Sequence, residues 1–334
     1  MLSKVILQSN IDKVAKIFDL AENIVIVTHV SPDGDALGSS LGLLHFLETQ
    51  EKNVHIIVPN AFPDFLKWMP GAKDIIRYDR YSDFADELIQ KADAICCLDF
   101  NALSRIDAVG PAVAAAKCRK VMIDHHLGPE DFCDVIISHP NISSTSELVF
   151  RVICRLGDFE DITHEGAECI YTGMMTDTGG FTYNSNNREI YFIISELLSK
   201  GIDKDEIYRK VFYTYSEDRL RLMGYVLYEK MQVFHQFRTG KAQLHTSKGM
   251  NGVINTAMVR DIAAGHTAVG CVDDGIALQR GNIALPEIQP RLNGCQVGNI
   301  RDTLCGGLVL QIGILCLQEI RANRISSADI HQTA

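Results

Sequence analysis

The chain has 334 residues, of which 46% are hydrophobic and 22% charged, and its formal net charge is −10. This length is enough to bury a sizeable core and favours two domains over one. The negative charge argues against binding long duplex nucleic acid through a general basic field, but it is compatible with a small phosphorylated substrate.

The hydrophobic residues are distributed as in a protein without a membrane span. No window reaches eighteen apolar residues, and the first ten are too mixed for a signal peptide, so we expect no membrane partner. The ten cysteines include no C-x-x-C pair. Scattered thiols of this kind are typical of a reducing compartment, and we expect a cytoplasmic protein.

Strand-like and helical patterns alternate from the start of the chain to about residue 180. The strand-like runs are 24–28, 54–58, 94–99, 121–124 and 135–138. The helical patterns are 36–47, 84–91, the Ala-rich stretch near Val113, and 144–154, which opens with capping-box spacing between Ser144 and Glu147. This order predicts an α/β fold, a parallel sheet flanked by helices, with ligands beyond the carboxyl ends of the strands.

The rest of the chain divides into two further regions. From Glu189 to about Gln236 the pattern is helical throughout, and a boundary is expected near Thr239 and Gly240. We therefore predict a catalytic domain over 1–188, a helical bridge over 189–239, and a smaller C-terminal region of uncertain fold over 240–334.

Four segments place carboxylates or imidazoles where a strand or an apolar run ends. Residues 28–39 form a tight Pro-Asp-Gly-Asp turn, which Gly34 allows. Residues 98–101 and 122–126 likewise lie at the ends of strand-like runs, and residues 175–181 close an apolar helical run. The candidate site side chains in these segments are His29, Asp33, Asp35, Asp99, His125, His126 and Asp177. Imidazole and carboxylate together suit Mn²⁺, Zn²⁺ or Fe²⁺ better than Ca²⁺.

Each segment alone has an ordinary structural explanation. An isolated aspartate after a strand is usually a turn or N-cap residue, and a lone histidine usually satisfies a structural hydrogen bond. Four such groups within one predicted domain are much harder to explain as turns, and together they indicate a metal site.

The order His-x-x-x-Asp-x-Asp, then Asp, then Asp-His-His, then Asp resembles the DHH phosphoesterase superfamily. That superfamily includes RecJ-like nucleases, manganese pyrophosphatases and exopolyphosphatases. Spacing and length are most similar to the bacterial branch that hydrolyses oligoribonucleotides and 3′-phosphoadenosine 5′-phosphate (pAp), over about residues 10–237. The resemblance implies two Mn²⁺ ions, with Mg²⁺, Co²⁺ or Fe²⁺ as alternatives.

The resemblance also implies a role for each side chain. His29 and Asp33 would hold the first metal. The second metal would be held by Asp35, His125 and Asp177. Asp99 would bridge both ions. His126 would face the substrate as a catalytic side chain, and Asp124 would orient a ligand histidine.

Two residues after the third predicted strand are candidates for substrate binding. Arg105 can clamp a phosphate in a bidentate way, although a solvated surface arginine explains it equally well. Asn101 lies in the same segment and is assigned with it.

The last part of the chain departs from the family. All 25 aromatic residues lie at or before Phe237, so the last 97 residues contain none. The Gly-Gly-Gly-His motif expected near the chain end is missing: Gly306 and Gly307 have no following histidine, and His266 lies too early. Two explanations stay open, a reading-frame shift near residue 240 and a replaced aliphatic domain.

The expected function is metal-dependent hydrolysis of short oligoribonucleotides and pAp. The expected partners are short RNA or a 3′,5′-bisphosphonucleotide, and the oligomeric state is open, a homodimer included. Alternative substrates are cyclic dinucleotides, pyrophosphate and polyphosphate. An alternative from another class is a defective nucleotide-binding protein with an impaired substrate domain.

Overall fold

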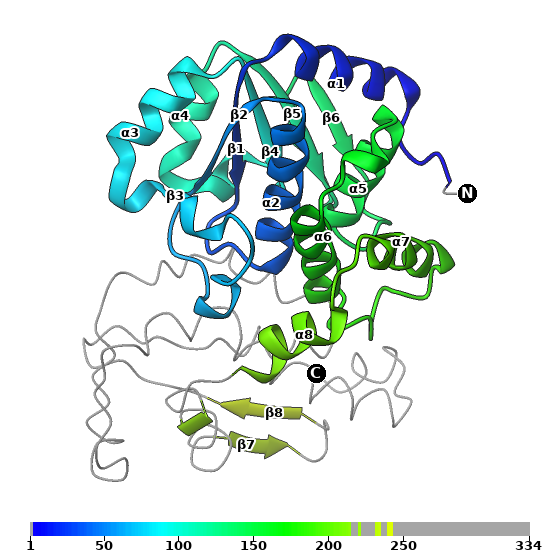
Figure 1. Ribbon diagram of the computed structural model, residues 1–334. Helices are drawn as coiled ribbons and strands as arrows, with labels where there is room; N and C mark the ends of the chain where they lie inside the picture. The colour runs from blue at the N-terminus through cyan, green and yellow to red at the C-terminus, as the bar shows by residue number, and fades with distance from the viewer. Residues whose placement is uncertain (1–2, 215–219, 222–230, 235–238, 243–334) are drawn as a thin grey trace, which may run out of the picture. The chain divides into compact units, whose positions relative to one another are not determined.

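Six parallel strands form a single sheet in the order β3-β2-β1-β4-β5-β6 (Figure 1). The computed structural model describes residues 3–214, 220–221, 231–234 and 239–242. The strands of the sheet are β1 Asn23–Thr28, β2 Asn53–Val58, β3 Ile76–Arg77, β4 Ala94–Leu98, β5 Arg119–Asp124 and β6 Val135–Ser138. The predicted α/β fold with a parallel sheet is confirmed.

Helices cover both faces of this sheet (Figure 1). The α-helices are α1 Gln8–Leu20, α2 Gly34–Thr49, α3 Tyr78–Lys91, α4 Gly110–Ala115, α5 Thr145–Leu156, α6 His164–Asp177, α7 Arg188–Ser199 and α8 Lys204–Tyr208. Short 3₁₀ turns occur at Asp64–Leu66, Ala72–Asp74, Leu103–Val109 and Phe159–Asp161, and a π-helical turn at Arg209–Tyr213. None of these described helices has the length and apolar character of a membrane span.

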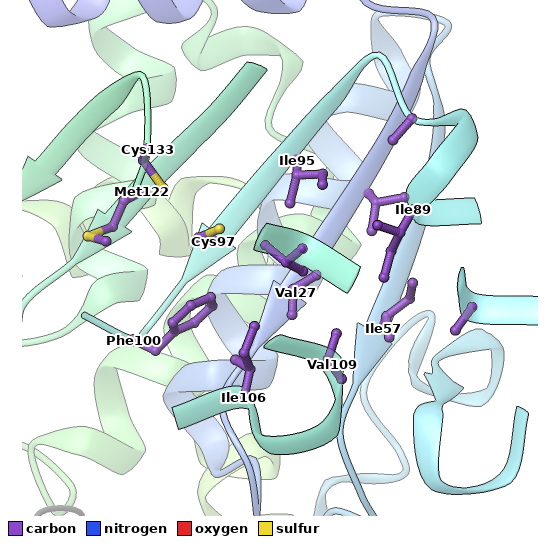
Figure 2. Close-up of a cluster of buried hydrophobic side chains, with 14 residues drawn as sticks. Val27, Ile57, Ile89, Ile95, Cys97, Phe100, Ile106, Val109, Met122 and Cys133 are labelled. Atoms are coloured by element: carbon purple, nitrogen blue, oxygen red, sulfur yellow. The ribbon is translucent and has the colours of Figure 1, made fainter. Parts of the chain in front are cut away.

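One face of the sheet packs on α3, α4 and the 3₁₀ turn Leu103–Val109 (Figure 2). Alternate side chains of the strands, such as Val27 and Cys97, point into this layer, where they meet Ile89 of α3 and Val109 of the turn. The two central strands, β1 and β4, are buried almost throughout. Such strands read as continuous apolar runs, which is why the sequence located them well.

The opposite face carries α2, with α5 and α6 packed against it. The contact between α2 and α6 is close because glycines meet there: a β-carbon on Gly38 would lie 2.7 Å from the backbone of Gly173. Gly34 has a different role from the expected one. It begins α2 instead of opening a loop, and a β-carbon there would lie 2.3 Å from the hydroxyl of Thr176.

The chain divides into two compact units, Met1–Thr214 and Tyr215–Ala334. In the second unit, β7 Met231–Phe234 pairs antiparallel with β8 Thr239–Ala242. The expectation of helix throughout 189–236 is therefore wrong at Met231–Phe234, and the boundary expected at Thr239 and Gly240 falls at the start of a paired strand. Short apolar runs do not by themselves distinguish helix from strand. The two explanations for residues 240–334 are a reading-frame shift and a replaced aliphatic domain. Both concern the chain after Ala242, which lies outside the described residues.

Candidate metal centre

The candidate site lies beyond the carboxyl ends of β1, β4 and β5. The order 3-2-1-4-5-6 reverses direction between β1 and β4, which is the switch point where open α/β sheets bind ligands. His29 follows β1, Asp99 follows β4, and His125 follows β5. The other donors come from the two ends of helices: Asp33 and Asp35 at the start of α2, and Asp177 at the last position of α6.

Three groups of donor atoms come together there, and within each group all atoms lie within 4.8 Å of one another. The groups are His29, Asp33 and Asp99; Asp35, His125 and Asp177; and Asp99, His125 and His126. The structure therefore gathers all seven side chains that the sequence singled out. The first two groups contain the side chains that the resemblance assigned to the first and to the second metal.

Asp99 lies between these groups and turns one carboxylate oxygen toward each. Its Oδ2 is 3.4 Å from His29 Nε2, and its Oδ1 is 3.6 Å from His125 Nε2. The backbone of Asp99 is left-handed, with φ +65°, which an aspartate tolerates better than most residues. Strained backbone of this kind is typical of functional sites.

The ring of His29 turns one nitrogen toward a backbone carbonyl and the other toward the acids. Its Nδ1 contacts the carbonyl oxygen of Val30 at 2.8 Å, which leaves Nε2 facing the carboxylates. That Nε2 is buried and has no hydrogen-bond partner in the described part of the chain. Burial by itself lowers the pKa of His29, but Asp33 and Asp99 raise it to about 10. The same negative field that favours a proton on Nε2 favours a cation, so the donor set fits a metal ion.

The carboxylates of the second group repel one another. Burial, reinforced by Asp99 and Asp177, raises the pKa of Asp35 well above its usual range. Burial also raises the pKa of Asp177 to about 7, although His125 opposes the shift. Asp99 differs: burial alone would raise its pKa, but His29 and the other histidines hold it below its usual range. A divalent cation would relieve the repulsion among these acids.

His125 lies among the acids of the second group. Its Nε2 is 3.8 Å from Asp177 Oδ2, and its Nδ1 lies 3.4 Å from the carbonyl oxygen of Ile142. Burial by itself lowers the pKa of His125, but Asp177 and Asp99 raise it to about 9. The backbone at Ile142, on the loop after β6, thus helps to set the direction of this ring.

Asp124 orients His126 and not His125. Its Oδ1 is 2.7 Å from His126 Nδ1, and its Oδ2 accepts the backbone N–H of His126 at 2.9 Å. The sequence predicted that Asp124 would hold a ligand histidine, but its partner is the histidine expected to face substrate. With Nδ1 bound to a carboxylate, His126 keeps Nε2 for other contacts.

Helix α5 supplies contacts that the sequence did not assign to the site. Thr145 N–H donates to Asp35 Oδ2 at 2.6 Å, and Ser146 N–H donates to Asp35 Oδ1 at 2.9 Å. The hydroxyl of Thr145 donates to Asp99 Oδ1 at 2.8 Å. Negative charge is favoured at a helix N-terminus. The capping box at Ser144 and Glu147 predicted where this helix begins. It did not predict that the helix start contacts Asp35 and Asp99.

Neither predicted substrate-binding residue makes a hydrogen bond or ion pair to a candidate metal ligand in the described part of the chain. Asn101 donates from Nδ2 to the carbonyl oxygen of Leu127 at 2.7 Å, so it holds the loop that follows His126. The backbone of Arg105 accepts a hydrogen bond from Val30 N–H at 2.8 Å, and its half-buried side chain has no ion pair with any described residue.

Comparisons with known proteins point to one family. The model of the DHH family, N-terminal domain, matches residues 23–174. The chain is 33% identical over 215 residues to the bifunctional oligoribonuclease and PAP phosphatase NrnA of Thermus thermophilus, which covers 64% of this chain and 61% of that protein. It is 24% identical over 226 residues to the cyclic-di-AMP phosphodiesterase PdeA of Listeria monocytogenes, covering 64% of this chain and 33% of that protein.

A solved structure is more similar in sequence. An exopolyphosphatase-related protein from Bacteroides fragilis is 72% identical, with a TM-score of 0.71 over 73% of this chain and 71% of that one. The chain belongs to the DHH family of phosphoesterases. Within the family it is similar to the oligoribonuclease and PAP phosphatase branch that the sequence predicted, although it spans only 61% of that Thermus relative.

Proposed function

We propose that this protein is a two-metal phosphoesterase that hydrolyses short oligoribonucleotides and pAp. The observation that carries the proposal is the position of Asp99, whose two oxygens face His29 and His125 from the two donor groups. A carboxylate in this position suits a bridging ligand. Mixed imidazole and carboxylate donors favour Mn²⁺, with Mg²⁺, Co²⁺ or Fe²⁺ as alternatives.

The chain's own residues would divide the work as follows. His29, Asp33 and Asp99 would hold one ion, and Asp35, His125 and Asp177 the other. The bound metals would supply Lewis acidity and an activated water at neutral pH. His126, held by Asp124, would present Nε2 to the phosphate and stabilise its charge or protonate the leaving oxygen.

The substrate class is supported by the resemblance to the oligoribonuclease and PAP phosphatase of Thermus thermophilus. Two other names favour alternatives: a cyclic-di-AMP phosphodiesterase among the relatives, and an exopolyphosphatase-related protein among the structures. Paired metal ions can activate water against a phosphate ester or a phosphoanhydride alike, so the test compares both kinds of substrate.

The test compares substrates on the full chain with Mn²⁺. We expect release of phosphate from pAp and of mononucleotides from a linear diribonucleotide, with kcat/KM above the values for cyclic-di-AMP, pyrophosphate and polyphosphate. Asp99→Asn serves as the control and should be inactive on all of them. A preference for pyrophosphate or polyphosphate, or turnover that Asp99→Asn retains, would overturn the proposal.

A further inference from the structure

A polar cavity of about 200 Å³ lies between the loop after β6 and the loop that joins α6 to α7. Four carboxamide side chains line it: Asn141, Asn184, Asn186 and Asn187. We call this cavity the asparagine pocket. Nothing in the proposed chemistry at the metal ligands uses these residues.

The asparagine pocket adjoins the metal centre through Ile142. This residue lines the pocket, and its carbonyl oxygen lies 3.4 Å from His125 Nδ1. Three positions further along the chain, Thr145 contacts Asp35 and Asp99. The wall of the pocket and the residues that contact the candidate metal ligands are therefore parts of one short segment, 141–145.

Three of the four carboxamides are available to a ligand. Asn187 uses its oxygen to cap α7, where it accepts the N–H of Glu189 at 3.0 Å. The side chains of Asn141, Asn184 and Asn186 are exposed and make no hydrogen bond to any described residue. The backbone of Asn184 is left-handed, with φ +46°, a conformation that asparagine tolerates.

The pocket carries no free charge in the described part of the chain. Its one ionisable residue is Glu147, which is 1% exposed. Arg151 donates to Glu147 Oε1 at 2.7 and 2.9 Å, and the hydroxyl of Ser143 donates to Oε2 at 2.6 Å. Because no lysine or arginine lines the pocket, it suits a neutral polar group and not a phosphate.

Carboxamides match the edge of a nucleobase. Each offers a donor and an acceptor side by side, the arrangement by which asparagine pairs with adenine in a bidentate way. The volume is below the roughly 300–1,000 Å³ of pockets that enclose a drug-sized ligand, so it fits one planar group and not a whole nucleotide. The side chains of Ile142 and Ile190 supply apolar lining.

We propose that the asparagine pocket binds a nucleobase of the substrate while the metal centre holds the adjoining phosphate. This inference rests on the proposed nucleotide substrate class. It assigns base recognition to Asn141 and Asn186 within the catalytic domain, and Asn184 completes the set from a fixed backbone position.

The experiment measures binding, so it does not depend on turnover. The full chain with Mn²⁺ is titrated with AMP and with ribose 5-phosphate, which lacks the base, by isothermal titration calorimetry. We expect AMP to bind more tightly. Asn141→Ala and Asn186→Ala should each weaken AMP by about 2- to 12-fold, the equivalent of one net hydrogen bond, and leave ribose 5-phosphate unchanged.

Two further variants separate recognition from folding. Asn186→Asp keeps the shape but replaces the donor by an acceptor, and it should weaken AMP as well. Asn53→Ala, at the start of β2 and at the opposite end of the sheet, should change neither ligand. Equal affinity for the two ligands in the wild type, or equal losses for both ligands in the pocket variants, would overturn the inference. Failure to hydrolyse any nucleotide would refute the proposed function and not this binding result.

Discussion

The hydroxyl of Thr145 donates to Asp99 Oδ1 at 2.8 Å, in a position where both side chains are almost completely buried. The backbone N–H of the same threonine holds Asp35. One residue at the start of α5 thus contacts Asp35 of the second donor group and Asp99, which lies between the two groups. With Asp99 held in this way, its Oδ2 is directed at His29.

Removal of that hydroxyl should weaken metal binding without changing the fold. Thr145→Val keeps the shape and the N–H to Asp35 but loses the bond to Asp99. Partners of this kind typically contribute 10- to 100-fold in metal affinity or activity, and we expect a loss of that size in Mn²⁺ titrations. Thr145→Ser keeps the hydroxyl and should stay near the wild type. Equal Mn²⁺ affinity in the valine and serine variants would show that the contact has no role in the site.

The sequence located the strand ends and their acids because buried parallel strands are continuous apolar runs. It did not reveal the contacts of Thr145, because those depend on how the start of α5 meets the start of α2 and the end of β4 in space. The partner of Asp124 was misassigned for a related reason: residues 124–126 are adjacent, and spacing alone does not decide which ring an aspartate faces. The strand Met231–Phe234 was missed because a four-residue run has no clear period.

Asp99 has a charge role and a backbone role, and two substitutions separate them. Asp99→Asn should lose Mn²⁺ binding and hydrolysis but unfold near the wild-type temperature, because asparagine tolerates φ +65°. Asp99→Ala should lose the same activity and also cost of order 1 kcal/mol of stability in the metal-free protein. Elemental analysis and thermal unfolding in EDTA measure the two effects. Wild-type Mn²⁺ stoichiometry in Asp99→Asn would contradict the bridging role.

The two histidines of the Asp-His-His segment should give different defects. His125→Ala should lose metal, since its Nε2 lies between Asp99 and Asp177. His126→Ala should keep metal and lower kcat by roughly 10²–10³ if it stabilises developing charge. Asp124→Asn should resemble the His126 variant, because Asp124 holds that ring. Metal content and kcat are measured on the same samples, and loss of metal in all three variants would refute the division.

An ion pair away from the candidate metal ligands, between Glu189 and Arg151, should make the stability of the fold fall at acid pH. Burial by itself raises the pKa of Glu189, but hydrogen bonds from Arg151 and Ser3 hold it at about 2, below the ordinary 4.5. A depressed carboxyl pKa adds stability above pH 4.5, and this contribution is lost as the pH falls toward 2. Glu189→Gln should therefore unfold at a lower temperature than the wild type at pH 7, and the difference should shrink at pH 3. A difference that stays constant between these pH values would exclude this pair as the cause.

Residues 243–334 either contribute to substrate binding or leave it to the catalytic domain. All the proposed metal ligands, and the asparagine pocket, lie within the unit Met1–Thr214. A chain ended at Ala242, which keeps β7 and β8, should therefore hydrolyse bis-p-nitrophenyl phosphate at close to the full-chain rate.

The same truncation should change hydrolysis of pAp or a dinucleotide little. Base stacking on an aromatic side chain is typically worth about 1–3 kcal/mol per base, and residues 243–334 contain no aromatic residue to provide it. The decisive quantity is the ratio of kcat/KM for the full chain to that for the truncated chain on a nucleotide. A ratio near one supports the view that these residues do not act as a substrate domain. A ratio above about ten would show that they bind substrate, because a segment with no role in capture could not raise kcat/KM on the nucleotide while leaving the generic diester unchanged.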